Sequence, residues 1–154
     1  MSIRSLLLAG PTGLVGDQVL RQALARPGVE RVQALTRREP APGADARVQW
    51  LRADFARLPA LQRADAAVCA LGTTIKVAGS QAAFRAVDHD AVLAFARAAQ
   101  AAGVPRLAVV SALGADPRSS VFYNRVKGEA EAALRTLGFE QLVIARPSLL
   151  VGDR

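Results

Sequence analysis

Three glycines near the start of the chain, Gly10, Gly13 and Gly16, constrain the fold more than any other feature. An apolar run at residues 3–9 precedes them, and residues 14–25 follow with apolar side chains at helical spacing. The pattern predicts a buried strand, a tight turn and a helix. Gly10 would permit the sharp turn, Gly13 would let another molecule approach the backbone, and Gly16 would let the helix pack closely on a sheet.

The rest of the chain repeats this alternation of strand-like and helix-like segments. Further strands are expected at 31–36, 47–51, 66–71, 107–111 and 142–145, with helices at 80–102 and 121–137 and a short helix just before the fourth strand. Strands alternating with helices predict right-handed βαβ units and one parallel sheet. We therefore expect an α/β fold, a Rossmann-type doubly wound sheet in three α/β/α layers, with all 154 residues in one domain.

The glycine loop would present free N–H groups and the positive end of a helix to an anion. This chemistry suits the pyrophosphate of a dinucleotide, so we expect NAD(P) to bind there. The spacing G-x-x-G-x-x-G differs from the commoner G-x-G-x-x-G, and a tight turn without a ligand is the alternative. The loop residues expected to bind the cofactor are Gly10, Thr12, Gly13, Leu14, Val15 and Gly16.

The end of the second strand selects between the two nicotinamide cofactors. NAD enzymes place an acid about 20 residues past the loop to hold the ribose hydroxyls, whereas this chain has Arg37 and Arg38, with Glu39 beyond them. Guanidinium groups suit a 2′-phosphate, which favours NADPH over NADH. The alternative is an exposed arginine pair with no ligand. Asp54, after the third strand, could accept from the adenine amino group or cap a turn.

Tyr123 and Lys127 form a Y-x-x-x-K pattern on a predicted helix, so their side chains share a face. A neighbouring cation favours the phenolate of tyrosine, which could then exchange a proton with a carbonyl oxygen while hydride is transferred. Ser111 ends the preceding strand, at the edge where such sheets bind ligands. A core tyrosine beside a surface lysine is the alternative, but the chain has one tyrosine and only two lysines.

With these patterns combined, the sequence resembles the short-chain dehydrogenase/reductase superfamily, and within it the atypical NAD(P)-binding branch that is similar to the Tat-interacting oxidoreductase and the NmrA-like proteins. The resemblance implies that Ser111, Tyr123 and Lys127 are catalytic and that Lys127 also holds the nicotinamide ribose. It further implies four cofactor contacts, at Gly72, Thr73, Pro147 and Ser148. It spans nearly the whole chain and rests on segments 10–16, 71–76, 87–88, 110–116, 123–129 and 146–148.

The sequence departs from these relatives in two ways. Asp88 stands where many of them have an asparagine that relays protons, which changes the local charge. Relatives also continue past the segment 146–148 into a smaller substrate-binding region, whereas this sequence stops at Arg154. Either the sequence is a fragment or the C-terminal substrate-binding part of the relatives is absent. The resemblance also implies a possible homodimer through the helices at 81–102 and 121–137.

Two functions are compatible with these residues. The first is an oxidoreductase that transfers hydride from NADPH to an unidentified small carbonyl-type substrate, with Tyr123 as the acid. The alternative is a redox-sensing regulator or partner-binding protein that holds NADP(H) and turns over little. An epimerase-like activity on nucleotide sugars uses the same three side chains, but it is less expected because the given sequence does not include the substrate region of such relatives.

The composition argues against several other classes. The net charge of +7 comes almost wholly from arginines scattered along the chain, which predicts a solvated surface and no nucleic-acid partner. No apolar run approaches the roughly 20 residues of a membrane helix, so no membrane partner is expected. Cys69 and His89, each the single residue of its type, cannot form a zinc site, and no metal is expected. One cysteine excludes an internal disulfide, from which we expect a cytoplasmic protein.

Overall fold

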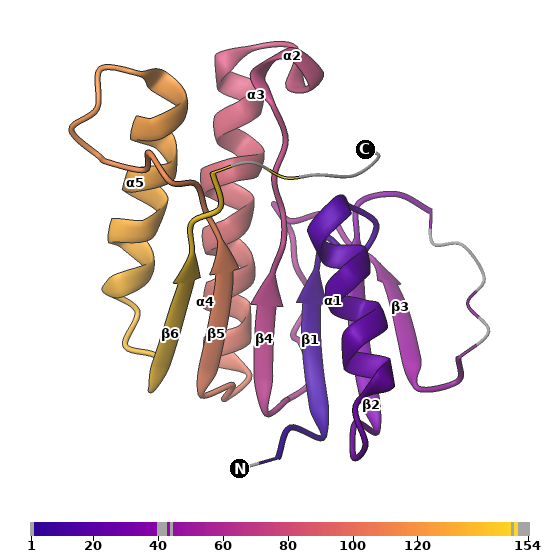
Figure 1. The fold of residues 1–154 in the computed structure, drawn as a ribbon. Helices are drawn as coiled ribbons and strands as arrows, with labels where there is room; N and C mark the ends of the chain where they lie inside the picture. The colour runs from indigo at the N-terminus through magenta and orange to yellow at the C-terminus, as the bar shows by residue number, and fades with distance from the viewer. Residues whose placement is uncertain (1, 40–42, 44, 149, 151–154) are drawn as a thin grey trace.

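The computed structural model describes residues 2–39, 43, 45–148 and 150, and the described part contains one sheet of parallel strands in the order β3-β2-β1-β4-β5-β6 (Figure 1). This order confirms the Rossmann-type prediction. The bounds of the strands are β1 (Ser5–Ala9), β2 (Arg31–Thr36), β3 (Val48–Arg52), β4 (Ala66–Cys69), β5 (Arg106–Val110) and β6 (Gln141–Ala145). Each lies within two residues of its predicted start and end.

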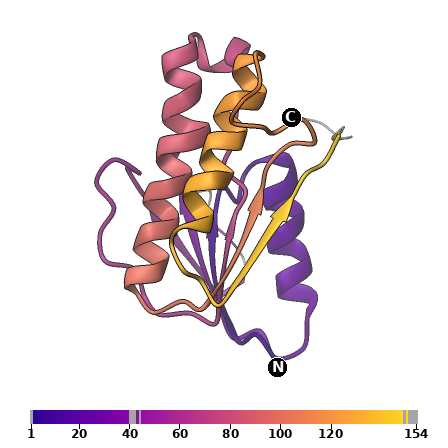
Figure 2. The ribbon, with the colours of Figure 1, turned by 90° about the vertical axis from the view of Figure 1, so that its left-hand side faces the viewer.

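Helices cover the sheet on both faces, as Figure 2 shows in side view. Helix α1 (Leu14–Ala25) packs on one face, over a core that includes Leu8, Leu20 and Val32. Helices α4 (Val92–Ala101) and α5 (Phe122–Arg135) pack on the other. The three layers are therefore as predicted.

One predicted helix is wrong and one observed helix was not predicted. Residues 53–65, where a short helix was expected before β4, contain no helix, although Phe55 and Leu61 are buried in the core on the α4 side. Pro59 has no N–H to donate and interrupts helical hydrogen bonding in this segment. The short helix lies instead after β4, as α2 (Ile75–Ala78), where the Thr74 hydroxyl accepts from the backbone N of Val77 at 3.1 Å.

The long helix predicted at 80–102 is continuous but not uniform. Ser80 caps it as expected, accepting from the backbone N of Ala83 at 3.0 Å. It begins as α3 (Gln81–Arg85), widens into a π-helical segment η1 (Ala86–Ala91) and continues as α4. A π-helical segment adds a residue to the turn and re-aims the side chains that it carries. In this chain it buries Asp88.

The strand order reverses between β1 and β4, which pair with each other although distant in sequence. Chains leaving the carboxyl ends of these two strands turn to opposite faces of the sheet, and ligands of open α/β sheets bind in the crevice that results. The glycine loop follows β1, and Gly72 follows β4. The topology therefore places two predicted cofactor segments at one point.

Candidate cofactor and catalytic site

The outer glycines of the loop are required by the protein's own packing. Gly10 has a φ of +80°, and a Cβ added there would lie 2.7 Å from the carbonyl oxygen of Ala70. A Cβ on Gly16 would overlap the carbonyl oxygen of Gly10. At Gly13, by contrast, the nearest atom to an added Cβ is 3.8 Å away. The space beside Gly13 is therefore left open by the fold.

The N-terminus of α1 begins at this open position. Gly13 is the N-cap residue, and its carbonyl accepts the first helical hydrogen bond from the backbone N of Asp17 at 2.9 Å. Because glycine has no side chain, it cannot cap the first-turn N–H groups itself. The N–H groups of Leu14, Val15 and Gly16 thus belong to an uncapped helix end. The loop fits a dinucleotide pyrophosphate, with exposed Thr12 at its rim.

The arginine pair lies directly beyond the carboxyl end of β2. Arg37 and Arg38 are exposed, and the Thr36 hydroxyl accepts from the backbone N of Arg38 at 3.2 Å. The nearby Glu39 forms an ion pair with Arg52 at 3.0 Å. Both guanidinium groups are therefore available at the ligand edge of the sheet, next to the strand that carries the glycine loop.

Asp54 has the geometry of a turn cap, which was one of its two alternatives. Its carboxylate accepts from the backbone N of Ala56 at 2.9 Å, within two residues of itself. The side chain is exposed after β3. One carboxylate oxygen of Asp54 is thus already occupied by a hydrogen bond within its own turn.

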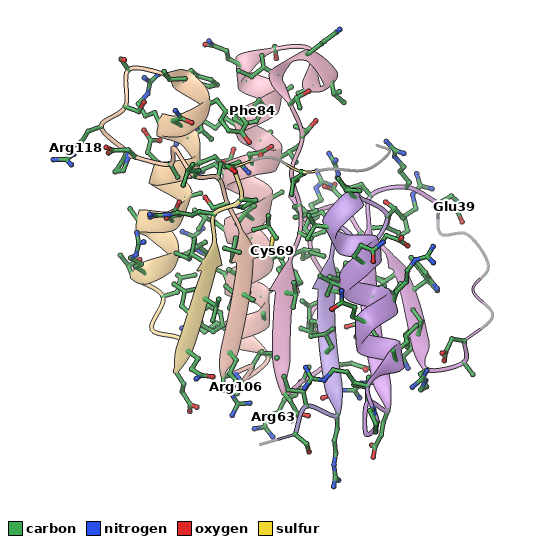
Figure 3. The ribbon with its side chains drawn as sticks, in the orientation of Figure 1. Glu39, Arg63, Cys69, Phe84, Arg106 and Arg118 are labelled. Carbon is green, nitrogen blue, oxygen red and sulfur yellow. The ribbon has the colours of Figure 1, made fainter. Side chains whose placement is uncertain are left out.

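Tyr123 and Lys127 lie on α5 next to a phenylalanine from α3. The ring of half-buried Tyr123 lies 5.2 Å from that of Phe84, centroid to centroid, and Lys127 Nζ lies 5.8 Å from the Tyr123 centroid. Figure 3 shows Phe84 near the ends of these helices above the carboxyl edge of the sheet. The ammonium and the phenol therefore share one face, as the four-residue spacing predicts.

Asp88 pairs with Lys127 in the interior. Lys127 Nζ lies 2.6 Å from Asp88 Oδ1, and the two side chains are 8% and 0% exposed. The other carboxylate oxygen accepts from the backbone N of Thr73 at 2.9 Å. Burial raises the pKa of Asp88, while Lys127, the Thr73 N–H and the Arg37 guanidinium act in the opposite direction. A Cβ on Gly72 would lie 3.5 Å from Asp88 Oδ1, so this glycine sits directly against the pair.

Ser111 is bound to a carboxylate that the sequence analysis missed. Its hydroxyl donates to buried Glu131 at 2.7 Å, and Arg146 Nε donates to the same carboxylate at 3.0 Å. A small cavity is bounded by Ser111, Glu131 and the Asp88–Lys127 pair. Glu131 lies four residues after Lys127, so its place on the shared helix face was a signal that could have identified it.

The last predicted contacts come from the segment after β6. The carbonyl of Pro147 accepts from the backbone N of Leu113 at 3.2 Å, and the carbonyl of Ala145 accepts from the backbone N of Ser111 at 2.7 Å. Ser148 follows with its side chain exposed. The segments after β5 and β6 therefore run side by side at the carboxyl edge, on the opposite side of β4 from Arg37 and Arg38.

Curated relatives match nearly the whole chain. The protein fmp52, mitochondrial, of Emericella nidulans is 35% identical over 96% of this chain and 67% of its own length. The protein HTATIP2 of Rattus norvegicus is 36% identical over 100% of this chain and 66% of its own length. These matches confirm the resemblance to the atypical branch of the short-chain dehydrogenases/reductases.

Solved structures match in fold at low identity. MoeE5 in complex with UDP-glucose and NAD has a TM-score of 0.76 at 19% identity, over 92% of this chain and 53% of its own. The UDP-glucuronic acid 4-epimerase of Bacillus cereus in complex with NAD has a TM-score of 0.74 at 15% identity. The chain thus spans about half the length of these proteins, 53% and 55%.

The comparisons correct the expected location. Fungal relatives that are 32% to 37% identical are named mitochondrial, so the cytoplasmic prediction is wrong. That prediction rested on a single cysteine, and a lack of disulfides does not distinguish one reducing compartment from another. In the part of the chain that the structure describes, no helix has both the length and the apolar character needed to cross a membrane.

The family match covers the site and nearly everything around it, from the glycine loop to the segment beyond β6. Residues 10–153 match the NAD(P)H-binding family, and the chain belongs to that family.

Proposed function

We propose that this chain is the cofactor-binding and catalytic part of an NADPH-dependent oxidoreductase in which Tyr123 donates a proton to a carbonyl oxygen. The observation that carries the proposal is the position of the Tyr123 and Lys127 side chains at the reversal point of the sheet. A Cβ added to Gly72, after β4, would lie 3.8 Å from Lys127 Nζ, while the open helix end at Gly13 lies after the neighbouring β1. The proposed pyrophosphate site and the proposed proton donor thus lie at the same carboxyl edge of the sheet.

The proposed chemistry divides between the cofactor and the chain. When bound, NADPH supplies a hydride for the carbonyl carbon. The Tyr123 phenol supplies the proton for the carbonyl oxygen, so that a carbonyl and NADPH become an alcohol and NADP⁺ once the phenol regains its proton from solvent. Phe84 shields one side of the phenol ring from water, and the Lys127 ammonium lies on the same helix face, 5.8 Å from the ring centroid.

The preference for NADPH rests on Arg37 and Arg38. Both are exposed beyond β2, and the one carboxylate in their immediate sequence, Glu39, pairs with Arg52. A 2′-phosphate at this edge could take bidentate, charge-assisted hydrogen bonds from a guanidinium. The unmodified ribose of NADH would offer no such anion.

Cofactor choice is tested by titrating NADPH and NADH against the parent protein, Arg37→Ala and Arg97→Ala. Arg97 is exposed on α4, so its variant removes the same charge away from the site. We expect the parent to prefer NADPH, and Arg37→Ala to weaken NADPH binding about tenfold with NADH nearly unchanged, a loss typical of one charge-assisted contact. If Arg97→Ala weakened NADPH binding as much as Arg37→Ala, the loss of affinity would come from the change in net charge and not from a local contact. No preference for NADPH in the parent would overturn the proposed cofactor.

The acid role is tested with Tyr123→Phe on a panel of small aldehydes, ketones and enones, followed by NADPH oxidation. The variant keeps the ring against Phe84 and removes only the hydroxyl, so NADPH affinity should stay within about twofold. Turnover should fall at least about 100-fold, the usual contribution of a positioned acid. A variant that turns over as fast as the parent would exclude Tyr123 as the acid.

The contact of Ser111 favours a second candidate, a redox-sensing regulator with little turnover. Its hydroxyl already donates its only proton to Glu131, so it does not offer that proton to a substrate in this arrangement. A regulator would differ between its NADP⁺- and NADPH-bound forms without consuming the cofactor. Hydrogen exchange in the loop 112–121 that differs between the two forms, with no turnover across the panel, would select this candidate.

A further inference from the structure

The charge of Lys127 is balanced inside the protein. Its ammonium lies 2.6 Å from the Asp88 carboxylate, and both groups are almost fully removed from solvent. The contact is held from both sides, because η1 aims Asp88 inward and the Thr73 N–H fixes the second carboxylate oxygen. The pair carries no net charge whether the shared proton lies on nitrogen or on oxygen.

This balance changes what Lys127 can do to the neighbouring phenol. A lone buried ammonium within about 6 Å would favour the phenolate, since a nearby opposite charge favours the ionised form. A compensating carboxylate in contact with the ammonium reduces that field to the field of a dipole, which falls off more steeply with distance. Tyr123, whose ring centroid is 5.8 Å from Lys127 Nζ, lies within the range where this difference matters.

We infer that Asp88 is a positioning residue that neutralises Lys127 and thereby keeps the Tyr123 phenol in its proton-bearing form. The inference rests on the proposed function, in which Tyr123 must hold a proton to reduce a carbonyl. An uncharged side chain at position 88 would leave the ammonium uncompensated and the phenol easier to ionise. The acid at this position therefore prepares the site for proton donation.

Charged and titratable groups on the surrounding elements do not replace Asp88. Arg37, beyond β2, is exposed and favours the charged form of Asp88. Cys69 on β4 is a buried thiol whose pKa burial raises to about 12, so it adds no charge near neutral pH. Glu131, which shares the small cavity, is bound by Ser111 and Arg146. Asp88 is the carboxylate in contact with Lys127.

The chain allows a direct test because Tyr123 is its one tyrosine. The tyrosinate band in near-ultraviolet difference spectra then reports this phenol alone, without substrate or cofactor. We would titrate the parent, Asp88→Asn and Asp90→Asn. Asp90 lies two residues further along η1, is 63% exposed and pairs with His89, so its variant removes the same charge without touching Lys127.

In Asp88→Asn we expect the midpoint of the tyrosinate band to move to lower pH by about one unit, the size of shift that an uncompensated neighbouring charge produces. In Asp90→Asn it should move by less than about 0.3 unit because that carboxylate is solvated. An unchanged or raised midpoint in Asp88→Asn would overturn the inference, as would equal shifts in the two variants.

A second variant keeps the test decisive if Asp88→Asn fails to fold. The double variant Asp88→Asn/Lys127→Met removes both charges and leaves a neutral site. Since the parent pair has no net charge, the midpoint of the double variant should stay within about 0.3 unit of the parent. A midpoint more than about one unit higher would mean that Lys127 acts on Tyr123 uncompensated, against the inference. Because neither titration involves NADPH, the inference can fail while the proposed function stands, and the reverse.

Discussion

Gly13 and Gly16 share one loop, yet an added methyl group would meet very different surroundings. At Gly16 it would overlap the Gly10 carbonyl, which is backbone and cannot give way without moving the turn. At Gly13 it would enter space that the protein leaves open, and the φ of −77° suits any residue. One glycine therefore serves the fold, and the other serves the proposed ligand.

Gly16→Ala should lower the free energy of unfolding by about 2 kcal/mol or more, as overpacking against rigid backbone does. Gly13→Ala should leave it nearly unchanged and weaken NADPH binding at least about tenfold, because the methyl group occupies the approach of the pyrophosphate. Thermal unfolding and cofactor titration on both variants separate the two effects. Unaltered cofactor affinity in Gly13→Ala would show that the pyrophosphate does not approach there.

Cys69 provides a second test at the residue scale. Its thiol is fully buried in β4, where burial raises its pKa to about 12, and the thiolate is the form that reacts. Iodoacetamide at pH 8 should therefore leave the folded chain unmodified for hours and label it within minutes in denaturant, as followed by mass spectrometry. Rapid labelling of the folded chain would contradict the burial of this strand.

At the scale of elements, local pattern predicted the strands and main helices but not their irregularities. The strands are short segments in which apolar residues are frequent, and α1 and α5 have periodic apolar faces, so local sequence identified them. The segment 53–65 also contains buried apolar residues, but it packs them into the core without forming a helix. The π-helical segment η1 depends on packing between elements, which no local pattern contains. For Glu131 the four-residue spacing from Lys127 was a local signal. Its partners Ser111 and Arg146, however, come from other segments and were not predictable in this way.

The contact between α5 and the loop before it is one such packing feature. A Cβ on Gly128 would lie 2.6 Å from Asp116 Cα and would overlap the peptide linking Asp116 to Pro117. The glycine thus lets the loop lie directly on the helix that carries Tyr123 and Lys127, at the residue that follows Lys127.

Gly128→Ala should therefore destabilise the protein by about 2 kcal/mol, although alanine favours a helix over glycine by about 1 kcal/mol. Ala132→Gly, at an exposed position of the same helix, is the control, and it should cost about 1 kcal/mol through helix propensity alone. Urea unfolding of both variants gives the two values. A stabilised Gly128→Ala would mean that the loop does not pack on α5 as described.

At the scale of the whole molecule, strand order decides which residues meet. The alternation of strands and helices predicted a parallel sheet, but it is the observed pairing of β1 with both β2 and β4 that brings Arg37, Gly13 and Gly72 to one edge. The same order leaves β6 at the margin of the sheet, where Val143 is 59% exposed on the face opposite α4 and α5. Sequence patterns alone could not place these segments relative to one another, because strand order is a long-range property.

The net charge of +7 gives the last prediction, because it acts on the cofactor as a whole. NADPH carries a 2′-phosphate that NADH lacks, so salt should weaken NADPH binding more steeply. Raising KCl from about 50 to about 500 mM should weaken NADPH binding roughly fivefold and NADH binding less than about twofold, over a range in which the Debye length falls from about 14 to about 4 Å. In Arg37→Ala the salt dependence of NADPH binding should become shallower and approach that of NADH, since the local guanidinium contact is lost while the distant charges still act on the additional phosphate. Isothermal titration at several salt concentrations measures the slopes. Parallel slopes for both cofactors in the parent would mean that no positive charge of the protein contacts a 2′-phosphate.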